Sequence, residues 1–200
     1  ACIRLTMTGE KTMSREDRIW APWRIGYILG DSKAAEELPV GQLCPGADPD
    51  CFLCRCAATT DQRKALVVYR NDLVLTVLNR YPYNNGHLLI APLRHRGRLE
   101  ELSQQEDNAV AQALKRFVAL LEKLLRPEGF NLGLNLGRVA GAGLPGHLHW
   151  HVVPRWGGDT NFMPVLAGVR VVPQSLDAVW ELMQEELSKQ PASSVSAGGS

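Results

Sequence analysis

The chain has 200 residues, of which 45% are hydrophobic and 22% charged, proportions typical of a single folded domain with a buried core. Its 22 Lys and Arg residues nearly balance 21 Asp and Glu residues, so the basic excess typical of a dedicated duplex-DNA-binding protein is missing. No apolar run approaches the roughly 20 residues that cross a bilayer, and no secretory signal is evident. With five cysteines, an odd number, these features exclude a membrane protein and a disulfide scaffold and predict a cytoplasmic protein.

The two ends of the chain differ in composition from its centre. Residues 1–18 are polar and we expect them to be mobile, and residues 191–200, rich in Ser, Ala and Gly, predict a disordered tail. One domain is therefore expected over residues 19–190. The aromatic-rich segment 20–28 should pack onto the body of this domain or onto a partner subunit. Residues 31–50, rich in Gly, Pro, Asp and Glu, predict a long loop.

The first regular elements are three short strands, predicted over residues 65–70, 73–79 and 86–92. A tight turn at Asn71 joins the first two. Short connections of this kind are typical of antiparallel pairing.

A long helix follows these strands. Ser103 and Glu106 have the spacing of a capping box, and the helix ends before Pro127. Its apolar residues recur at helical spacing: Val110, Leu114, Phe117, Leu121 and Leu124.

Two further strands, over residues 130–136 and 147–154, precede a C-terminal helix. That helix carries an apolar stripe of Leu176, Val179, Trp180, Met183 and Leu187. The order of elements predicts an α+β fold with a mainly antiparallel sheet, one long helix and a C-terminal helix.

The most informative segment contains three alternating histidines, His147, His149 and His151. In an extended strand these imidazoles share one face at intervals of about 6.6 Å, with apolar residues on the other face. Such a row can bind a metal ion or perform nucleophilic and acid–base chemistry near neutral pH. The glycine-rich segment 135–146 directly before it resembles a cradle for phosphate. A chance run of surface or core histidines is the alternative.

The alternation of histidine with apolar residues over 147–153 matches the motif of the histidine triad superfamily of nucleotide hydrolases and transferases. Residues 78–95, which read LNRYPYNNGHLLIAPLRH, resemble the first conserved region of that family. The likeness covers about residues 65–157. Through residue 164 the chain is similar to a bacterial branch linked with diadenosine tetraphosphate phosphorylase activity.

The resemblance implies a role for several residues. His149 would be the nucleophile that attacks the α-phosphorus, and His151 would contact the phosphoryl group and assist the leaving group. Asn79 matches a ribose contact and Asn135 a phosphate contact. Gly143, also at the phosphate, stands where many relatives carry Gln.

Cys51 and Cys54 form a C-x-x-C pair that can hold zinc, and His95 could supply a third ligand. The resemblance adds His147 as the fourth ligand of a closed, structural Zn²⁺ site. A pair of buried free thiols is the alternative. No organic cofactor is expected.

The leading functional hypothesis is cleavage of a dinucleoside polyphosphate at the α-phosphate, by phosphorolysis or hydrolysis, through a nucleotidyl-histidine intermediate. The alternatives are an AMP-amine phosphoramidate hydrolase and a non-catalytic nucleotide-binding protein. A catalytic zinc on all three histidines is disfavoured, because ligands about 6.6 Å apart do not converge on one ion.

The expected partners are adenosine nucleotides, with orthophosphate as a candidate second substrate, and further copies of the chain in a dimer or higher homo-oligomer. No nucleic acid or membrane is expected. Trp156, just after the triad, is a candidate for lining the nucleotide pocket, and His87 is either a partner of the triad or a core residue.

Overall fold

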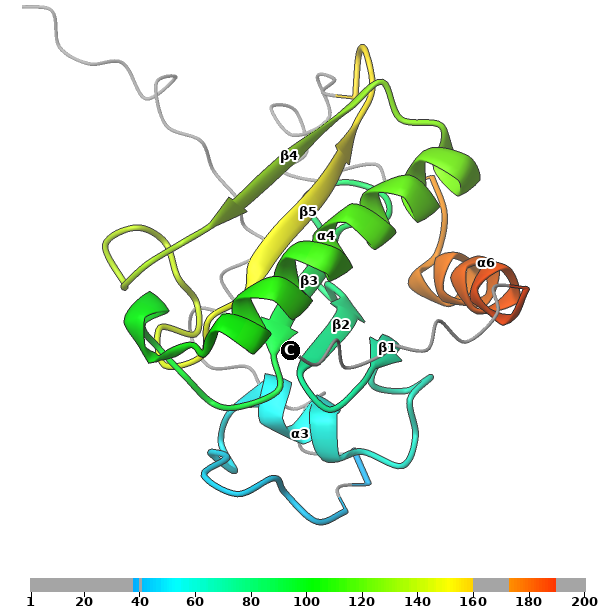
Figure 1. Ribbon diagram of the computed structural model, residues 1–200. Helices are drawn as coiled ribbons and strands as arrows, with labels where there is room; N and C mark the ends of the chain where they lie inside the picture. Colours follow the sequence, from blue (N-terminus) through cyan, green and yellow to red (C-terminus); the bar gives the residue numbers. More distant parts are fainter. Residues whose placement is uncertain (1–37, 40, 160–172, 190–200) are drawn as a thin grey trace, which may run out of the picture.

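The computed structural model describes residues 38–39, 41–159 and 173–189, and its centre is a five-stranded antiparallel sheet (Figure 1). The strand order is β1-β2-β3-β5-β4. The elements are α3 (Phe52–Ala58), β1 (Val67–Arg70), β2 (Val74–Leu78), β3 (Leu88–Pro92), η3 (Leu99–Glu101), α4 (Gln104–Leu125), β4 (Gly129–Leu134), β5 (Trp150–Arg155) and α6 (Leu176–Ser188). The predicted α+β class is confirmed. The expectations for residues 1–18, 20–28 and 191–200 lie outside the described residues.

The first strands are shorter than predicted. The backbone of Leu66 is left-handed, with φ of 57°, so β1 begins only at Val67 and not at Ala65. After β1, the side chain of Asn71 accepts hydrogen bonds from the backbone N–H groups of Leu73 and Val74. These bonds close the predicted tight turn between β1 and β2.

Helix α4 forms as its sequence predicts. Ser103 is the N-cap, and both hydrogen bonds of the capping box with Glu106 are present. Arg126, with φ of 48°, ends the helix directly before Pro127.

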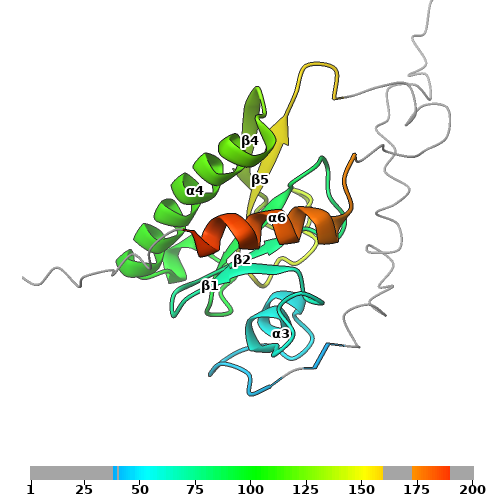
Figure 2. The same ribbon diagram turned by 90° about the vertical axis from the view of Figure 1, so that its right-hand side faces the viewer.

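Strands β2 and β3 are buried on both faces, so this part of the structure has three layers (Figure 2). Helices α4 and α6 pack on one face, and α3 packs on the other. The first core contains Leu78, Leu88, Ile90, Phe117, Leu121, Val152 and Met183. The second core contains Leu53, Cys54, Val67, Leu75, Val77, Leu89 and Ala91. Each layer removes apolar side chains from water, at about 25 cal/mol per Å² of buried surface.

The two edges of the sheet differ in what covers them. Helix α6 covers the β1 edge, where Trp180 Nε1 and Gln184 Nε2 donate to the carbonyls of Val67 and Val68, each at 2.9 Å. Strand β4 forms the other edge, and its Leu132 is 53% exposed. Among the described residues, no helix is both long and apolar enough to cross a membrane.

The prediction that a strand covers residues 147–154 is wrong at its beginning, because β5 starts at Trp150. The backbone N–H of His147 donates to the carbonyl of Leu144 in a turn, and that of Leu148 donates to Arg96 rather than to a strand. Of the three histidines, only His151 lies in the sheet. This departure frees His147 to turn its side chain away from His151.

Candidate active site and metal centre

Four predicted metal ligands meet in one cluster. Helix α3 presents Cys51 at its N-cap and Cys54 in its first turn, His95 follows β3, and His147 precedes β5. Their ligand atoms all lie within 4.8 Å of one another, with Cys51 Sγ to His147 Nδ1 and Cys54 Sγ to His95 Nδ1 both 3.3 Å. Sulfur and nitrogen ligands of a tetrahedral zinc stand about 3.5 Å apart. The cluster therefore fits a metal ion.

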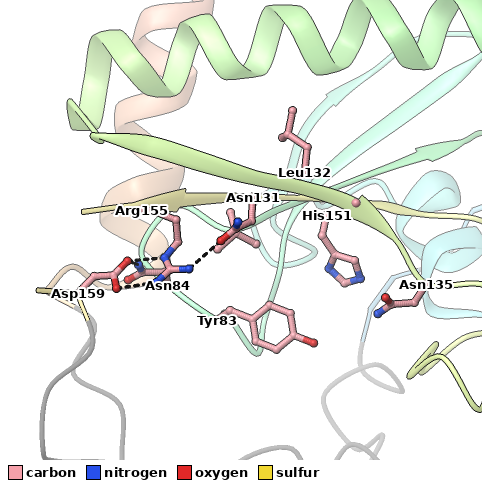
Figure 3. Close-up of a pocket in the computed structure, with 10 residues that line it drawn as sticks. Tyr83, Asn84, Asn131, Leu132, Asn135, His151, Arg155 and Asp159 are labelled. Atoms are coloured by element: carbon pink, nitrogen blue, oxygen red, sulfur yellow. Dashed lines mark hydrogen bonds and ion pairs between the residues drawn. The ribbon is translucent and has the colours of Figure 1, made fainter. Parts of the chain in front are cut away.

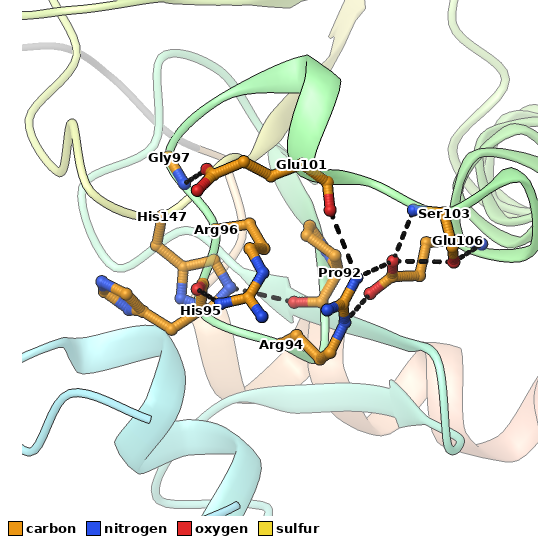
Figure 4. Close-up of polar contacts among 9 residues, drawn as sticks. All are labelled: Pro92, Arg94, His95, Arg96, Gly97, Glu101, Ser103, Glu106 and His147. Carbon is orange, nitrogen blue, oxygen red and sulfur yellow. Dashed lines mark hydrogen bonds and ion pairs between the residues drawn. The ribbon is translucent and has the colours of Figure 1, made fainter. Parts of the chain in front are cut away.

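The chemical state of these side chains also suits a metal. The Nε2–H of His147 donates to the carbonyl of Pro92 at 2.9 Å, which leaves the Nδ1 lone pair facing the thiols (Figure 4). Burial lowers the pKa of His147 to about 4, so the ring is neutral near pH 7. Burial raises the pKa of the Cys51 thiol, so a thiolate there requires a cation beside it.

His149 lies two residues further on and is 5% exposed. Its Nδ1 is 2.8 Å from the carbonyl of His147, and a carbonyl only accepts, so Nδ1 carries the proton. The other ring nitrogen, Nε2, consequently holds a lone pair. Burial lowers the pKa of His149, which favours the neutral ring. The side chain has the form of a nucleophile or base.

His151 has the opposite tautomer, and His87 determines it. The backbone N–H of Tyr83 donates to His87 Nδ1 at 3.0 Å, so the proton of a neutral His87 is on Nε2. That Nε2–H is 3.0 Å from His151 Nδ1, which accepts it. A neutral His151 thus carries its own proton on Nε2. The sequence left the role of His87 open, and the structure makes it a partner of the triad.

The rings of His149 and His151 are neighbours, with centroids 5.2 Å apart. One ring offers a lone pair at Nε2 and the other a proton at Nε2. A lone pair beside an N–H donor is an arrangement that suits group transfer at phosphorus.

A hollow of about 390 Å³ opens beside this pair on the same face of the sheet (Figure 3). Its lining residues are Tyr83, Asn84, Asn131, Leu132, Gly133, Asn135, His151, Val153, Arg155 and Asp159. Two predicted site residues, His151 and Asn135, are among them. The predicted contacts Asn79, Gly143 and Trp156 are not, and neither is His149.

The side chains of Asn79 and Trp156 form hydrogen bonds outside the hollow. Asn79 Nδ2 lies 3.2 Å from His87 Nδ1, and Asn79 Oδ1 accepts from the Tyr81 N–H at 3.0 Å. Trp156 Nε1 donates to the carbonyl of Arg126 at 3.2 Å. Asn79, directly after β2, thus contacts His87, which is the hydrogen-bond partner of His151.

The sequence missed a polar network along the rim of the hollow. Arg155 Nε and Nη2 bind the two oxygens of Asp159 at 2.5 and 2.9 Å, and Nη1 binds Asn131 Oδ1 at 2.7 Å. Asn84 Nδ2 also donates to Asp159, at 2.7 Å. The i,i+4 spacing of Arg155 and Asp159 was a visible signal. Only the pairing of β4 with β5 brings Asn131 to them, and Asn84 reaches Asp159 from the loop between β2 and β3.

A histidine pair with opposite tautomers and a Cys₂His₂ cluster on an antiparallel sheet together fit a protein that performs group transfer with histidine side chains. A model of the HIT domain family matches residues 60–158. The AP-4-A phosphorylase of Mycobacterium tuberculosis is 38% identical over 179 residues, covering 87% of this chain and 86% of that protein. The chain belongs to the HIT domain family.

Solved structures agree with this assignment. The Zn-bound histidine triad family protein of Mycobacterium smegmatis superposes with a TM-score of 0.51 at 26% identity, covering 62% of this chain and 84% of that one. A hypothetical histidine triad nucleotide-binding protein from Sulfolobus tokodaii has the same TM-score at 23% identity, over 62% of this chain and 83% of that one. The second likeness concerns the fold alone.

Proposed function

We propose that this chain is an enzyme that cleaves a dinucleoside polyphosphate at an α-phosphorus, with diadenosine tetraphosphate as the expected substrate. The observation that carries the proposal is the pair of opposite tautomers on His149 and His151. The relative named AP-4-A phosphorylase supports the choice of substrate.

In the first step, Nε2 of His149 attacks the α-phosphorus. A P–N bond forms as the P–O bond to the rest of the phosphate chain breaks, and the leaving oxygen departs as an anion that accepts a hydrogen bond from the Nε2–H of His151. In the second step, orthophosphate or water attacks the nucleotidyl-histidine, and a new P–O bond forms as the P–N bond breaks. Nε2 of His149 regains its lone pair, and the proton of an attacking water passes to solvent. Both histidines return to their starting forms.

The remaining substrate contacts follow the family pattern. Asn135 and the backbone around Gly143 would stabilise negative charge on the phosphoryl oxygens. Asn79 would hold the ribose of the nucleotide that is transferred, and Trp156 would line the nucleotide pocket.

For the metal centre we propose one Zn²⁺ held by Cys51, Cys54, His95 and His147. Four protein ligands leave no position for substrate, so the ion would cross-link α3 to the loop after β3 and to the histidine segment. Ligation needs reduced thiols, which supports the expected cytoplasmic location.

We also propose that the chain forms a homo-oligomer, a dimer or a higher assembly. Strand β4 is an edge strand with the exposed side chain of Leu132, whereas α6 covers the opposite edge. An uncovered edge favours pairing with a second copy.

The test is to incubate the zinc-loaded protein with diadenosine tetraphosphate, with and without orthophosphate. We expect ADP plus ATP only when phosphate is present; AMP plus ATP without phosphate would instead indicate a hydrolase. In His149→Ala, turnover should disappear while zinc content and far-UV circular dichroism remain as in the wild type. Cleavage of an adenosine phosphoramidate but not of the tetraphosphate would overturn the proposal.

A further inference from the structure

We infer that the hollow bounded by β4, β5 and the Tyr83 loop binds the nucleoside at the leaving end of the substrate. This inference rests on the proposed function. It assigns the hollow to the second nucleoside of a dinucleoside polyphosphate, not to the nucleotide that is transferred to His149.

The position of the hollow relative to the two histidines places it on the leaving side. His151 lines it, and the proposed nucleophile His149 does not. In an in-line displacement the leaving group departs opposite the nucleophile, toward the residue that donates a hydrogen bond to it. Asn79, the proposed ribose contact of the transferred nucleotide, is separated from the hollow by His87 and His151, which are hydrogen-bonded in series. The transferred nucleoside would therefore lie on the Asn79 side of the histidines, and the leaving nucleoside would lie in the hollow.

The extent of the hollow exceeds what a single phosphate would fill. It follows β5 from His151 to Arg155, five residues that span about 13 Å of strand. Its volume of about 390 Å³ lies within the range of small-molecule sites. A phosphate chain can lie at the His151 end while a nucleoside occupies the Arg155 end.

The charge at the Arg155 end favours a neutral ligand group. The guanidinium of Arg155 is paired through two nitrogens with the carboxylate of Asp159, so the positive charge is compensated. The Asp159 side chain is only 9% exposed and is also held by Asn84. A polyphosphate needs uncompensated cations or many N–H donors, whereas a base and a ribose need neutral hydrogen-bonding groups.

The lining supplies such groups. Because Asn131 Oδ1 accepts from Arg155, its amide nitrogen remains as a donor on the wall of the hollow. Tyr83 packs one ring face on His87, with centroids 4.9 Å apart and an interplanar angle of 17°. In Figure 3 its phenol ring extends below His151 into the hollow. An aromatic ring with carboxamides nearby is a surface on which a base can stack and be hydrogen-bonded.

The experiment compares two substrates that differ only in the leaving nucleoside, diadenosine tetraphosphate and adenosine 5′-tetraphosphate. We expect the wild-type kcat/KM to be at least tenfold higher for the dinucleotide. In Asn131→Ala this ratio should fall about fivefold, the effect of losing one hydrogen bond worth about 1 kcal/mol. The matched control is Asn108→Ala on the exposed face of α4, which should keep the wild-type ratio.

The outcomes separate the two proposals. Cleavage of both substrates with equal kcat/KM would overturn the inference and leave the proposed function intact. Cleavage of neither would refute the proposed function, and the inference with it. A binding measurement on His149→Ala provides an independent check: ATP should bind more tightly than inorganic triphosphate, and Asn131→Ala in that background should remove most of the difference. Equal binding of the two would also overturn the inference.

Discussion

Removing the charge of Glu106 should destabilise the protein at neutral pH but not at low pH. The Glu106 side chain is 2% exposed, and it accepts hydrogen bonds from Arg94 Nε at 2.6 Å and from the Ser103 N–H at 2.8 Å (Figure 4). These contacts, chiefly that with Arg94, lower the pKa of Glu106 from 4.5 to about 2. At 1.36 kcal/mol per pH unit, the carboxylate contributes up to about 3 kcal/mol to the free energy of unfolding.

The direction of this pH dependence follows because the pKa of Glu106 is lower in the folded state than in the unfolded state. The contribution is complete above pH 4.5 and disappears as the pH falls toward 2, because protonation then no longer distinguishes the two states. Glu106→Gln keeps an oxygen for the Ser103 N–H but removes the charge and the oxygen that accepts from Arg94 Nε. Urea unfolding should therefore show a deficit of about 2–3 kcal/mol at pH 7 that shrinks below pH 4.5.

Comparing the wild type with Glu106→Gln at equal pH removes the effects of other titrating groups, which are common to both proteins. The control is Glu100→Gln, where an exposed carboxylate pairs with Arg98 and no resolvable loss is expected. A deficit of the same size at pH 7 and pH 3 would show that the Glu106 charge is not its source, and would refute the reasoning.

Three further predictions concern His87, the turn at Gly86 directly before it, and the edge strand β4. His87→Phe removes the donor to His151 Nδ1 and should lower kcat about 10- to 100-fold with little change in KM, as steady-state kinetics can measure. Gly86→Ala should lower the free energy of urea unfolding by about 1–2 kcal/mol, because φ is +73° and a Cβ would lie 2.5 Å from Leu125 Cδ1. Leu132→Lys should shift the mass measured by light scattering toward the monomer, and an unchanged mass would place the interface elsewhere.

Features set by local sequence were predictable. The capping box of Ser103 and Glu106 depends on residues three apart, and α4 forms where it indicates. The metal cluster was also predicted in full, but the link from Cys51 and Cys54 to His147 came from family resemblance. Helix α3 was missed, because its seven residues are too few to show a helical period.

Features set by tertiary contacts were not predictable. The alternation of the histidines indicates a strand, but His147 leaves it because its ring is held by Cys51 and by the Pro92 carbonyl. The tautomer of His151 depends on the backbone N–H of Tyr83, which no residue pattern reveals.

The position of His147 connects the proposed metal centre to the proposed nucleophile. Its ring faces Cys51 Sγ at 3.3 Å, and its own carbonyl accepts the Nδ1–H of His149 at 2.8 Å. A side chain that is held at the cluster thus also fixes the backbone group that sets the tautomer of His149. Loss of the metal should disturb both.

Cys51→Ser tests this connection, with Cys56→Ser as a matched control. Both cysteines are buried, Cys51 at the N-cap of α3 and Cys56 within it. The Cys56 thiol, however, donates to the carbonyl of Ala65 and lies outside the cluster. We expect Cys51→Ser to lose bound zinc, to unfold at a lower temperature and to lose about tenfold in kcat, while Cys56→Ser keeps its zinc and its kcat. Zinc is counted by atomic absorption on the purified proteins. If Cys51→Ser loses its zinc and retains full kcat, then His147 does not transmit order from the metal centre to His149, and the lone pair on His149 must be fixed by other contacts.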